Sequence, residues 1–134
     1  MNTFIVELQN KPGELARVAE AIAQKGINIT AFSGATCGGS GSVALLTNDE
    51  AGTRNALRES GHAAREVEVV STTLEHKPGT LAAAVRKLAD AGINIDAALP
   101  IAMESGRVTI AFATDNPAKA KGILGTPAAV GAMS

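Results

Sequence analysis

The chain carries the same stretch twice, 66 residues apart. Lys11-Pro12-Gly13 through Ile27-Asn28-Ile29 returns as Lys77-Pro78-Gly79 through Ile93-Asn94-Ile95, and 11 of the 21 residues from 11 to 31 are identical at that offset. Since half of 134 residues is 67, we interpret the protein as two copies of one unit, residues 1–68 and 69–134. A unit of this size buries only about 60% of its unfolded surface, so we expect the two copies to pack together.

Each copy is predicted to be a small α+β unit with the order β-α-β-β-α-β. Residues 3–8 place Phe4, Val6 and Leu8 at every second position, on one face of a half-buried strand. Asn10 is a suitable N-cap for the helix that follows, and Pro12 is tolerated in its first turn. The helix is predicted to bury a stripe formed by Leu15, Val18, Ala19 and Ile22. It should end at Gly26 in the left-handed conformation.

The rest of the first copy is read from turn and cap signals. We expect strands over 27–35, 42–47 and 65–70, with a glycine-rich turn over 37–41 between the first two. Asn48 or Asp49 is predicted to cap a second helix that Gly61 ends. This is the split βαβ, or ferredoxin-like, pattern.

The second copy repeats the pattern with two departures. No linker separates the copies, because residues 66–75 are continuously strand-like and their apolar phase shifts between Val69 and Val70. A two-residue period absorbs such a shift only at a bulge or bend, so we expect one continuous segment to pass between two sheets. The second copy also lacks a convincing fourth strand: residues 126–134 are rich in Gly, Pro and Ala and are expected to fray. Its helix stripe is predicted at Leu81, Val85, Leu88 and Ala89.

Composition limits the functions to consider. The 12 basic and 13 acidic side chains nearly balance, which argues against nucleic acid or an anionic membrane as the main partner. No apolar run approaches the roughly 20 residues that span a bilayer, and the first residues do not resemble a signal peptide. A cytoplasmic location is the expectation. The single cysteine, Cys37, allows no internal disulfide, and no cofactor or metal is predicted.

The repeated motif resembles a known family. A strand, then Asn-x-Pro-Gly-x-Leu opening a helix, then Gly-Ile-Asn-Ile opening the next strand, is similar to the ACT domain. The chain resembles a tandem pair over nearly its whole length, although His76 stands where the motif usually has Asp or Asn. The resemblance implies two ferredoxin-like units with antiparallel sheets joined side by side and helices on one face. It also implies a non-catalytic regulatory protein that binds a free amino acid where two units meet.

The motif residues have chemistry that suits a zwitterion. The helix after Gly13 presents unpaired backbone N–H groups at its positive end, which favours a carboxylate. Strand-edge carbonyls and an Asn amide can accept from an ammonium group. On the family geometry, one site would combine Asn10, Lys11, Pro12, Gly13, Glu14 and Leu15 with Asn94 and Ile95. A second would combine His76, Gly79, Thr80 and Leu81 with Asn28 and Ile29.

Several alternatives stay open. The Pro-Gly and Gly-Ile-Asn-Ile segments could also serve only to start a helix and a strand, with no role in binding. His76 either contacts a ligand or only caps its helix. The differences Glu14 to Thr80 and Thr30 to Asp96 suggest that the two sites are not equivalent. A dimerisation or protein-docking module with no small ligand is the alternative function. Partners expected from the resemblance are a second copy of the chain and a regulated metabolic enzyme.

Catalysis and RNA binding find little support. Two histidines, no tyrosine and a lone cysteine without a basic neighbour offer no acid–base or nucleophilic constellation. RNA-binding units of this topology stack bases on sheet aromatics, whereas Phe4 and Phe112 lie on the predicted core phase of their strands. We therefore expect neither an enzyme nor an RNA-binding protein.

Overall fold

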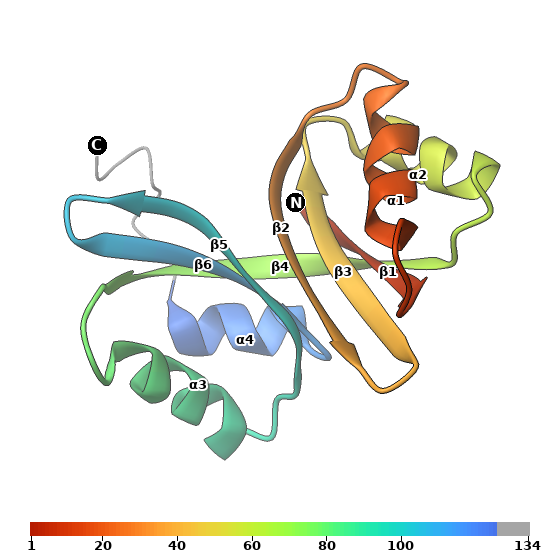
Figure 1. Cartoon of the computed structure of the whole chain (residues 1–134). Coiled ribbons are helices and arrows are strands. Elements are labelled where there is room, and N and C mark those ends of the chain that lie inside the picture. Colours follow the sequence, from red (N-terminus) through yellow and green to blue (C-terminus); the bar gives the residue numbers. More distant parts are fainter. Residues whose placement is uncertain (126–134) are drawn as a thin grey trace. The chain divides into compact units, whose positions relative to one another are not determined.

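A computed structural model describes residues 1–125, in which six strands alternate with four helices. The elements of the chain, drawn in Figure 1, are β1 (Asn2–Gln9), α1 (Glu14–Ala23), β2 (Ile29–Cys37), β3 (Ser40–Thr47), α2 (Glu50–Glu59), β4 (Ala64–Glu75), α3 (Thr80–Asp90), β5 (Ile95–Glu104), β6 (Arg107–Thr114) and α4 (Pro117–Leu124). The chain divides into two compact units, Met1–Val67 and Glu68–Ser134. The stretch 126–134, for which we predicted fraying and no convincing strand, lies outside the described residues.

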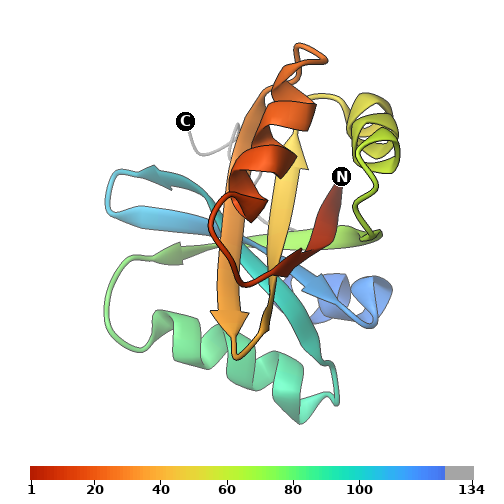
Figure 2. The same cartoon turned by 45° about the vertical axis from the view of Figure 1, so that its right-hand side comes forward.

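Unit 1 is an antiparallel sheet with α1 and α2 on one face (Figure 1). β3 lies between β1 and β2, with Phe4 opposite Leu45 and Phe32 also opposite Leu45. Figure 2 shows the long β2–β3 hairpin, which turns at Gly38 and Gly39. The core on the helix side is aliphatic apart from one aromatic ring, and it consists of Phe4, Val6, Val18, Ile22, Ile27, Val43, Leu45, Ala56 and Leu57.

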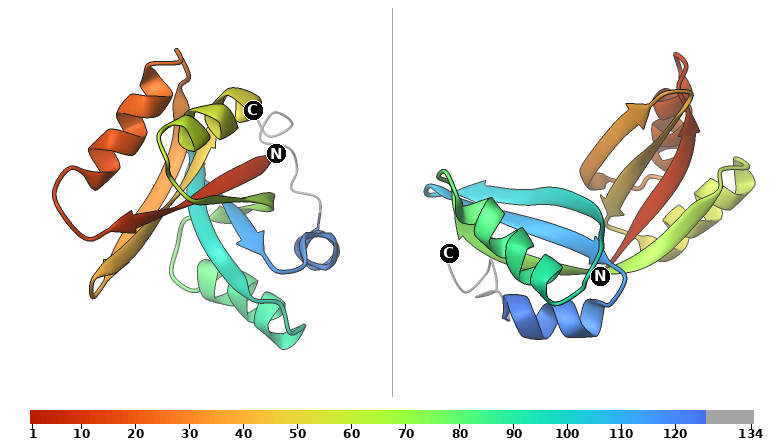
Figure 3. Two further views of the ribbon diagram at one scale, coloured as in Figure 1. Left: turned by 90° about the vertical axis from the view of Figure 1, so that its right-hand side faces the viewer. Right: turned by 90° about the horizontal axis from the view of Figure 1, so that it is seen from below.

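Unit 2 repeats this arrangement. β6 lies between β4 and β5, and α3 and α4 lie together on one side of these strands (Figure 3). Its core contains Val70, Leu88, Ile93, Phe112 and Ala120, so Phe112 takes the single aromatic position. The predicted α+β class of ferredoxin-like units is therefore confirmed, as are the predicted core positions of Phe4 and Phe112, each 1% exposed.

The two units share one strand. β4 runs without interruption from Ala64 to Glu75, as the absence of a linker predicted. Its start lies beside β1, where the Glu7 N–H donates to the Ala63 carbonyl (3.1 Å), and the rest pairs with β6 from Val69 to Glu75. Val69 and Val70 are both buried, which accounts for the shift in apolar phase between them. The pairing with β6 contains no bulge there, so the shift follows from burial of both faces of the strand.

Two predictions about the repeated helices are wrong. Leu15 and Leu81 are 46% and 50% exposed, although both were placed on the buried stripes. Val18 and Ile22 are buried as predicted, but the first inward position of α1 is Glu14 rather than Leu15. The helix begins directly after Gly13, and the Glu14 carboxylate takes the inward position because it finds hydrogen-bond donors there.

The predicted capping role of Asn10 is also wrong. Gly13 and Gly79 are the N-cap residues of α1 and α3, and neither helix has a side-chain cap. This result also excludes His76 as a cap. The predicted cap of the second helix is confirmed at Asp49, and Asn116 caps α4 with Pro117 at its start. Gly26 and Gly61 have positive φ where helix ends were predicted, and Gly92 has the same conformation after α3.

Candidate functional site

The corner between β1 and α1 leaves backbone donors without partners. Gly13 has φ 91° and ψ −11°, a left-handed conformation that suits glycine and starts the helix abruptly. Within residues 1–125, the Leu15 and Ala16 N–H groups make no hydrogen bond. The two helices that are not part of the repeated motif differ, because Asp49 and Asn116 accept from backbone N–H groups of their first turns. The corner therefore presents the positive end of a helix to its surroundings.

Glu14 fixes this corner to the sheet. Its side chain is only 8% exposed; Oε1 accepts from the Gln9 N–H (3.2 Å), and Oε2 forms an ion pair with Arg17. The Gln9 hydrogen bond and the nearby Arg17 hold the pKa of the Glu14 carboxyl below its usual value of 4.5. Glu14 is thus ionised at neutral pH, and both of its oxygens are already bound within the protein.

The exposed part of the corner borders a small pocket within unit 1. Asn10 Nδ2 donates to the Gly38 carbonyl (2.8 Å), which ties the corner to the β2–β3 turn. We call the adjoining pocket the Leu15–Phe32 pocket. It measures about 370 Å³, and it is lined by Leu8, Gln9, Asn10, Lys11, Glu14, Leu15, Phe32, Gly34, Ala35, Thr36, Ser42 and Val43. Its size lies within the range of ordinary small-molecule sites. Leu15 and Phe32, 46% and 62% exposed, give it an apolar rim.

The sequence patterns did not predict the lining that β2 contributes. Phe32 and the segment 34–36 were assigned no role, yet they form the wall opposite Leu15. One signal was present: Phe32 is a large apolar residue out of phase with buried Ala31 on the same strand. An exposed aromatic side chain on a strand indicates a contact surface.

The corner of unit 2 has the same backbone and different chemistry. Gly79 has φ 91° and ψ −17°, and Leu81 is exposed as Leu15 is. At the position of Glu14, however, the Thr80 hydroxyl donates to the Glu75 carbonyl (2.7 Å). Thr80 N–H also donates to the Lys77 carbonyl (3.4 Å), which leaves this helix with fewer unpaired donors. The two corners are therefore unequal, with an internal carboxylate only in unit 1.

His76 lies in the unit 2 corner beside the β5–β6 turn. Its backbone N–H donates to the Gly106 carbonyl (2.8 Å), just as the Asn10 N–H donates to Gly39 (3.3 Å). The neighbouring Lys77 and Glu75 form an ion pair (2.7 Å), and this contact lowers the pKa of Glu75. The His76 ring itself is exposed, so a role for it in ligand binding stays a prediction.

Asn28 and Asn94 stand just before β2 and β5, and each is hydrogen-bonded to the loop that follows the next strand of the chain. The Asn28 N–H donates to Asn48 Oδ1 (3.0 Å), and the Asn94 N–H donates to Asp115 Oδ1 (3.0 Å). Within unit 1, the register places Gln9 beside Ser40 and Ile29 beside Thr47, so the Pro-Gly corner and Asn28 lie at opposite ends of the sheet. No single unit brings the two motif segments together. The predicted pairing of each corner with Asn28–Ile29 or Asn94–Ile95 of the other unit stays a prediction.

The remaining candidate residues have ordinary surroundings. Cys37 is an exposed free thiol at the hairpin end. Among residues 1–125, no group of three or more His, Cys, Asp or Glu is arranged to hold a metal ion. None of the helices in that part of the chain is long and apolar enough to cross a membrane.

Comparison with known proteins identifies the family. A family model described as an ACT domain pair matches residues 1–126, so the chain belongs to this family. The predicted resemblance is thereby confirmed. A search among curated proteins found no match.

Solved structures share the fold. Protein BT0572 from Bacteroides thetaiotaomicron matches with a TM-score of 0.75 and 24% identity, over 92% of this chain and 85% of that one. The ligand-free regulatory subunit of aspartate kinase from Thermus thermophilus matches with a TM-score of 0.60 and 19% identity, over 92% and 88% of the two chains. The equivalent subunit from Thermus flavus gives 0.60 and 18%, over 92% and 90%. At these identities the likeness shows that the fold is the same.

Proposed function

We propose that this protein is a non-catalytic regulatory protein that binds a free amino acid at the Pro-Gly corner of unit 1. One observation carries the proposal: the uncapped start of α1 lies beside a pocket with the exposed side chains of Leu15 and Phe32. The free N–H groups of Leu15 and Ala16 suit the ligand carboxylate. The apolar rim suits its side chain.

The family supports a regulatory role. Two of the structurally similar proteins are regulatory subunits of aspartate kinase, and the comparison suggests that this chain also controls a metabolic enzyme. A ligand that binds only the folded protein stabilises it by RT ln(1 + [L]/Kd), about 2.7 kcal/mol when its concentration is 100-fold above Kd. A ligand that binds only the associated state at this saturation would shift the association equilibrium with a partner about a hundredfold.

Calorimetric titration with each of the twenty amino acids tests the proposal. We expect one amino acid, or a few with related side chains, to bind and to raise the melting temperature. Phe32→Ser should weaken that binding at least tenfold because it removes the apolar wall. Met103→Ser is the matched control, since it removes a similarly exposed apolar side chain (67% against 62% for Phe32) from a strand position that belongs to neither candidate site. If none of the twenty binds, the proposed function is wrong.

A docking or dimerisation module without a ligand is the second candidate, and β2 is the observation that favours it. β2 is the last strand in the hydrogen-bonded order, so within residues 1–125 one of its edges has no strand partner. Its sequence from Ile29 to Cys37 contains no charged residue and no proline. Such an edge can pair with another strand. We propose that it joins two copies of the chain into a homodimer, a state that is compatible with amino-acid binding.

A further inference from the structure

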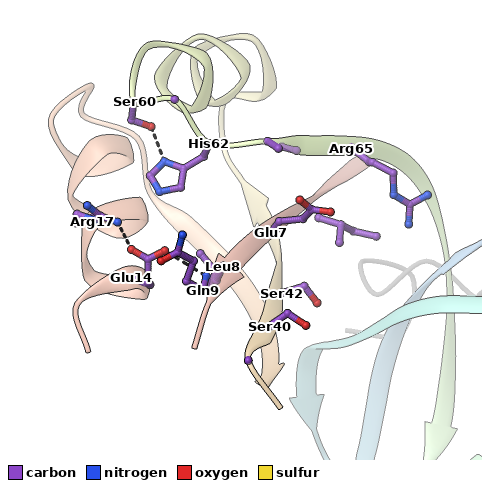
Figure 4. A pocket seen from close by; sticks show the side chains of 16 residues that line it. Glu7, Leu8, Gln9, Glu14, Arg17, Ser40, Ser42, Ser60, His62 and Arg65 are labelled. Atoms are coloured by element: carbon purple, nitrogen blue, oxygen red, sulfur yellow. Dashed lines mark hydrogen bonds and ion pairs between the residues drawn. The ribbon is translucent and has the colours of Figure 1, made fainter. Parts of the chain in front are cut away.

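A second and larger pocket lies on the other side of Glu14, within unit 1. We call it the His62 pocket; it measures about 940 Å³ and is drawn in Figure 4. Leu8, Gln9, Glu14 and Ser42 line both this pocket and the smaller one at the Pro-Gly corner. Glu14 therefore separates two cavities, and the proposed function uses only one of them.

The His62 pocket exists because β4 begins too late to cover all of β1. The Glu7 N–H donates to the carbonyl of Ala63, the residue just before β4, and the next N–H on the same edge of β1 belongs to Gln9. No strand reaches Gln9 there. Its N–H is bound by the Glu14 carboxylate, and its carbonyl accepts from the Lys11 N–H (3.0 Å). The edge is thus closed to an added strand, while the space beside it stays open.

Charged side chains of both signs line this space. In Figure 4, Glu14, Arg17 and His62 approach from the helix side, whereas Glu7, Ser40 and Ser42 approach from the strands. With Arg65, the lining contains two arginines and two glutamates, so its formal charge balances when His62 is neutral. A ligand of a single sign would meet repulsion from half of these groups. A dipolar ligand with no net charge matches them best.

His62 is held in position for such a ligand. Its Nδ1 lies 2.8 Å from the Ser60 hydroxyl, and its backbone N–H donates to the Leu57 carbonyl (3.0 Å). The other ring nitrogen, Nε2, makes no hydrogen bond to any residue from 1 to 125. Arg17 shares only one of its two terminal nitrogens with Glu14, which leaves further N–H groups of the guanidinium for a ligand.

Unit 2 has lost the charges at the equivalent positions. At the 66-residue offset, Glu7, Glu14 and Arg17 become Thr73, Thr80 and Ala83. Thr73 and the facing Thr109 bind each other instead (2.8 Å). The helix motif is about half identical between the copies, yet all three of these charged positions changed. Unit 1 alone therefore has the charged wall.

We infer that the His62 pocket is a second amino-acid site, in which Arg17 and His62 bind the ligand carboxylate and Glu7 accepts from its ammonium group. The inference rests on the proposed function for its class of ligand. It adds a site that lies entirely in unit 1, with Glu14 as a common wall between the two bound molecules.

Titration of the full-length protein with the amino acid that binds it tests this inference. Glu7→Gln and His62→Ala should each weaken one binding event about tenfold, as expected for the loss of a hydrogen bond with a charged ligand group. Phe32→Ser should leave that event unchanged. The amine and the carboxylic acid that carry the same side chain as the ligand should both bind this site more weakly, because each lacks one of the two charges. Ser71→Ala in β4 serves as the control for a polar change outside either pocket.

The outcomes separate the two proposals. A binding event that is lost in Glu7→Gln and His62→Ala but kept in Phe32→Ser supports the second site. If Phe32→Ser removes all binding and the pocket variants change nothing, the second site is wrong and the proposed function stands. If no amino acid binds the unsubstituted protein, both are wrong. Circular dichroism of each variant shows whether the fold is kept, and the exposed position of Glu7 makes Glu7→Gln the safer of the two pocket variants.

Discussion

At the scale of single residues, Glu14 gives a prediction about pH. Its pKa is lower in the fold than in the unfolded chain, so the stability it contributes is complete above pH 4.5 and is lost as the pH falls through the lower, folded value. We expect Glu14→Gln to be less stable than the unsubstituted protein at pH 7. The gap in the free energy of urea unfolding should become smaller at pH 3, because below pH 4.5 the unfolded chain takes up a proton that the folded carboxylate accepts only at lower pH.

A matched control is available in Glu59, whose exposed side chain pairs with Lys25. Glu59→Gln should change the free energy of unfolding little at either pH, because exposed ion pairs contribute little. A gap for Glu14→Gln that is the same at pH 7 and pH 3 would show that the charge of Glu14 does not stabilise the corner.

Glu14 also shows where reasoning from sequence fails at this scale. An apolar periodicity assigns Leu15 to the core and Glu14 to the surface, because it counts side-chain hydrophobicity alone. In the structure Glu14 is buried, since the Gln9 N–H and Arg17 satisfy its two oxygens. Both partners come from outside the pattern. Local periodicity cannot reveal that a charged residue has hydrogen-bond and ion-pair partners that offset the free-energy cost of its burial.

At the scale of elements, the helix starts fall into two kinds, and this difference is testable. Asp49→Ala removes the side-chain cap of α2 and should lower the free energy of unfolding by about 1 kcal/mol. Asn116→Ala should do the same for α4. Asn10→Ala is the control: Asn10 stands before α1 but does not cap it, so its loss should cost only about 0.5 kcal/mol or less. Chemical denaturation measures all three. An Asn10 variant as unstable as the Asp49 variant would contradict this assignment of caps.

The exposed edge of β2 leads to a prediction about association. Ser33→Lys places a charge on an exposed position of β2 outside the Leu15–Phe32 pocket. If the proposed homodimer forms through this edge, the variant should sediment as a monomer at concentrations where the unsubstituted protein is a dimer. Met103→Lys on β5 is the control, because that strand already carries Asp96 and Pro100. A monomeric unsubstituted protein, or a dimer that Ser33→Lys does not alter, would exclude β2 as the interface.

At the scale of the whole molecule, the sequence predicted what repetition and turn chemistry determine. The ten elements of residues 1–125 were predicted in order from the 66-residue offset and the glycines at helix ends. The missing linker predicted the uninterrupted β4. The pockets were not predictable in this way. The Leu15–Phe32 pocket combines a helix start with the middle of β2, and the His62 pocket depends on where β4 first meets β1. Both arise from packing between segments far apart in the chain, on which local patterns carry no information.

The shared strand predicts how the whole chain unfolds. Each unit is too small to be more than marginally stable alone. Because β4 contributes to both units, its unfolding in one unit should disrupt the other as well. Phe4→Ala in unit 1 and Phe112→Ala in unit 2 each empty a core position that is 1% exposed and should cost about 3–5 kcal/mol. In scanning calorimetry we expect each variant to melt in one transition, at a lower temperature than the unsubstituted protein, with equal calorimetric and van't Hoff enthalpies. Two separate peaks, of which each substitution moves only one, would mean that the units unfold independently in spite of their common strand.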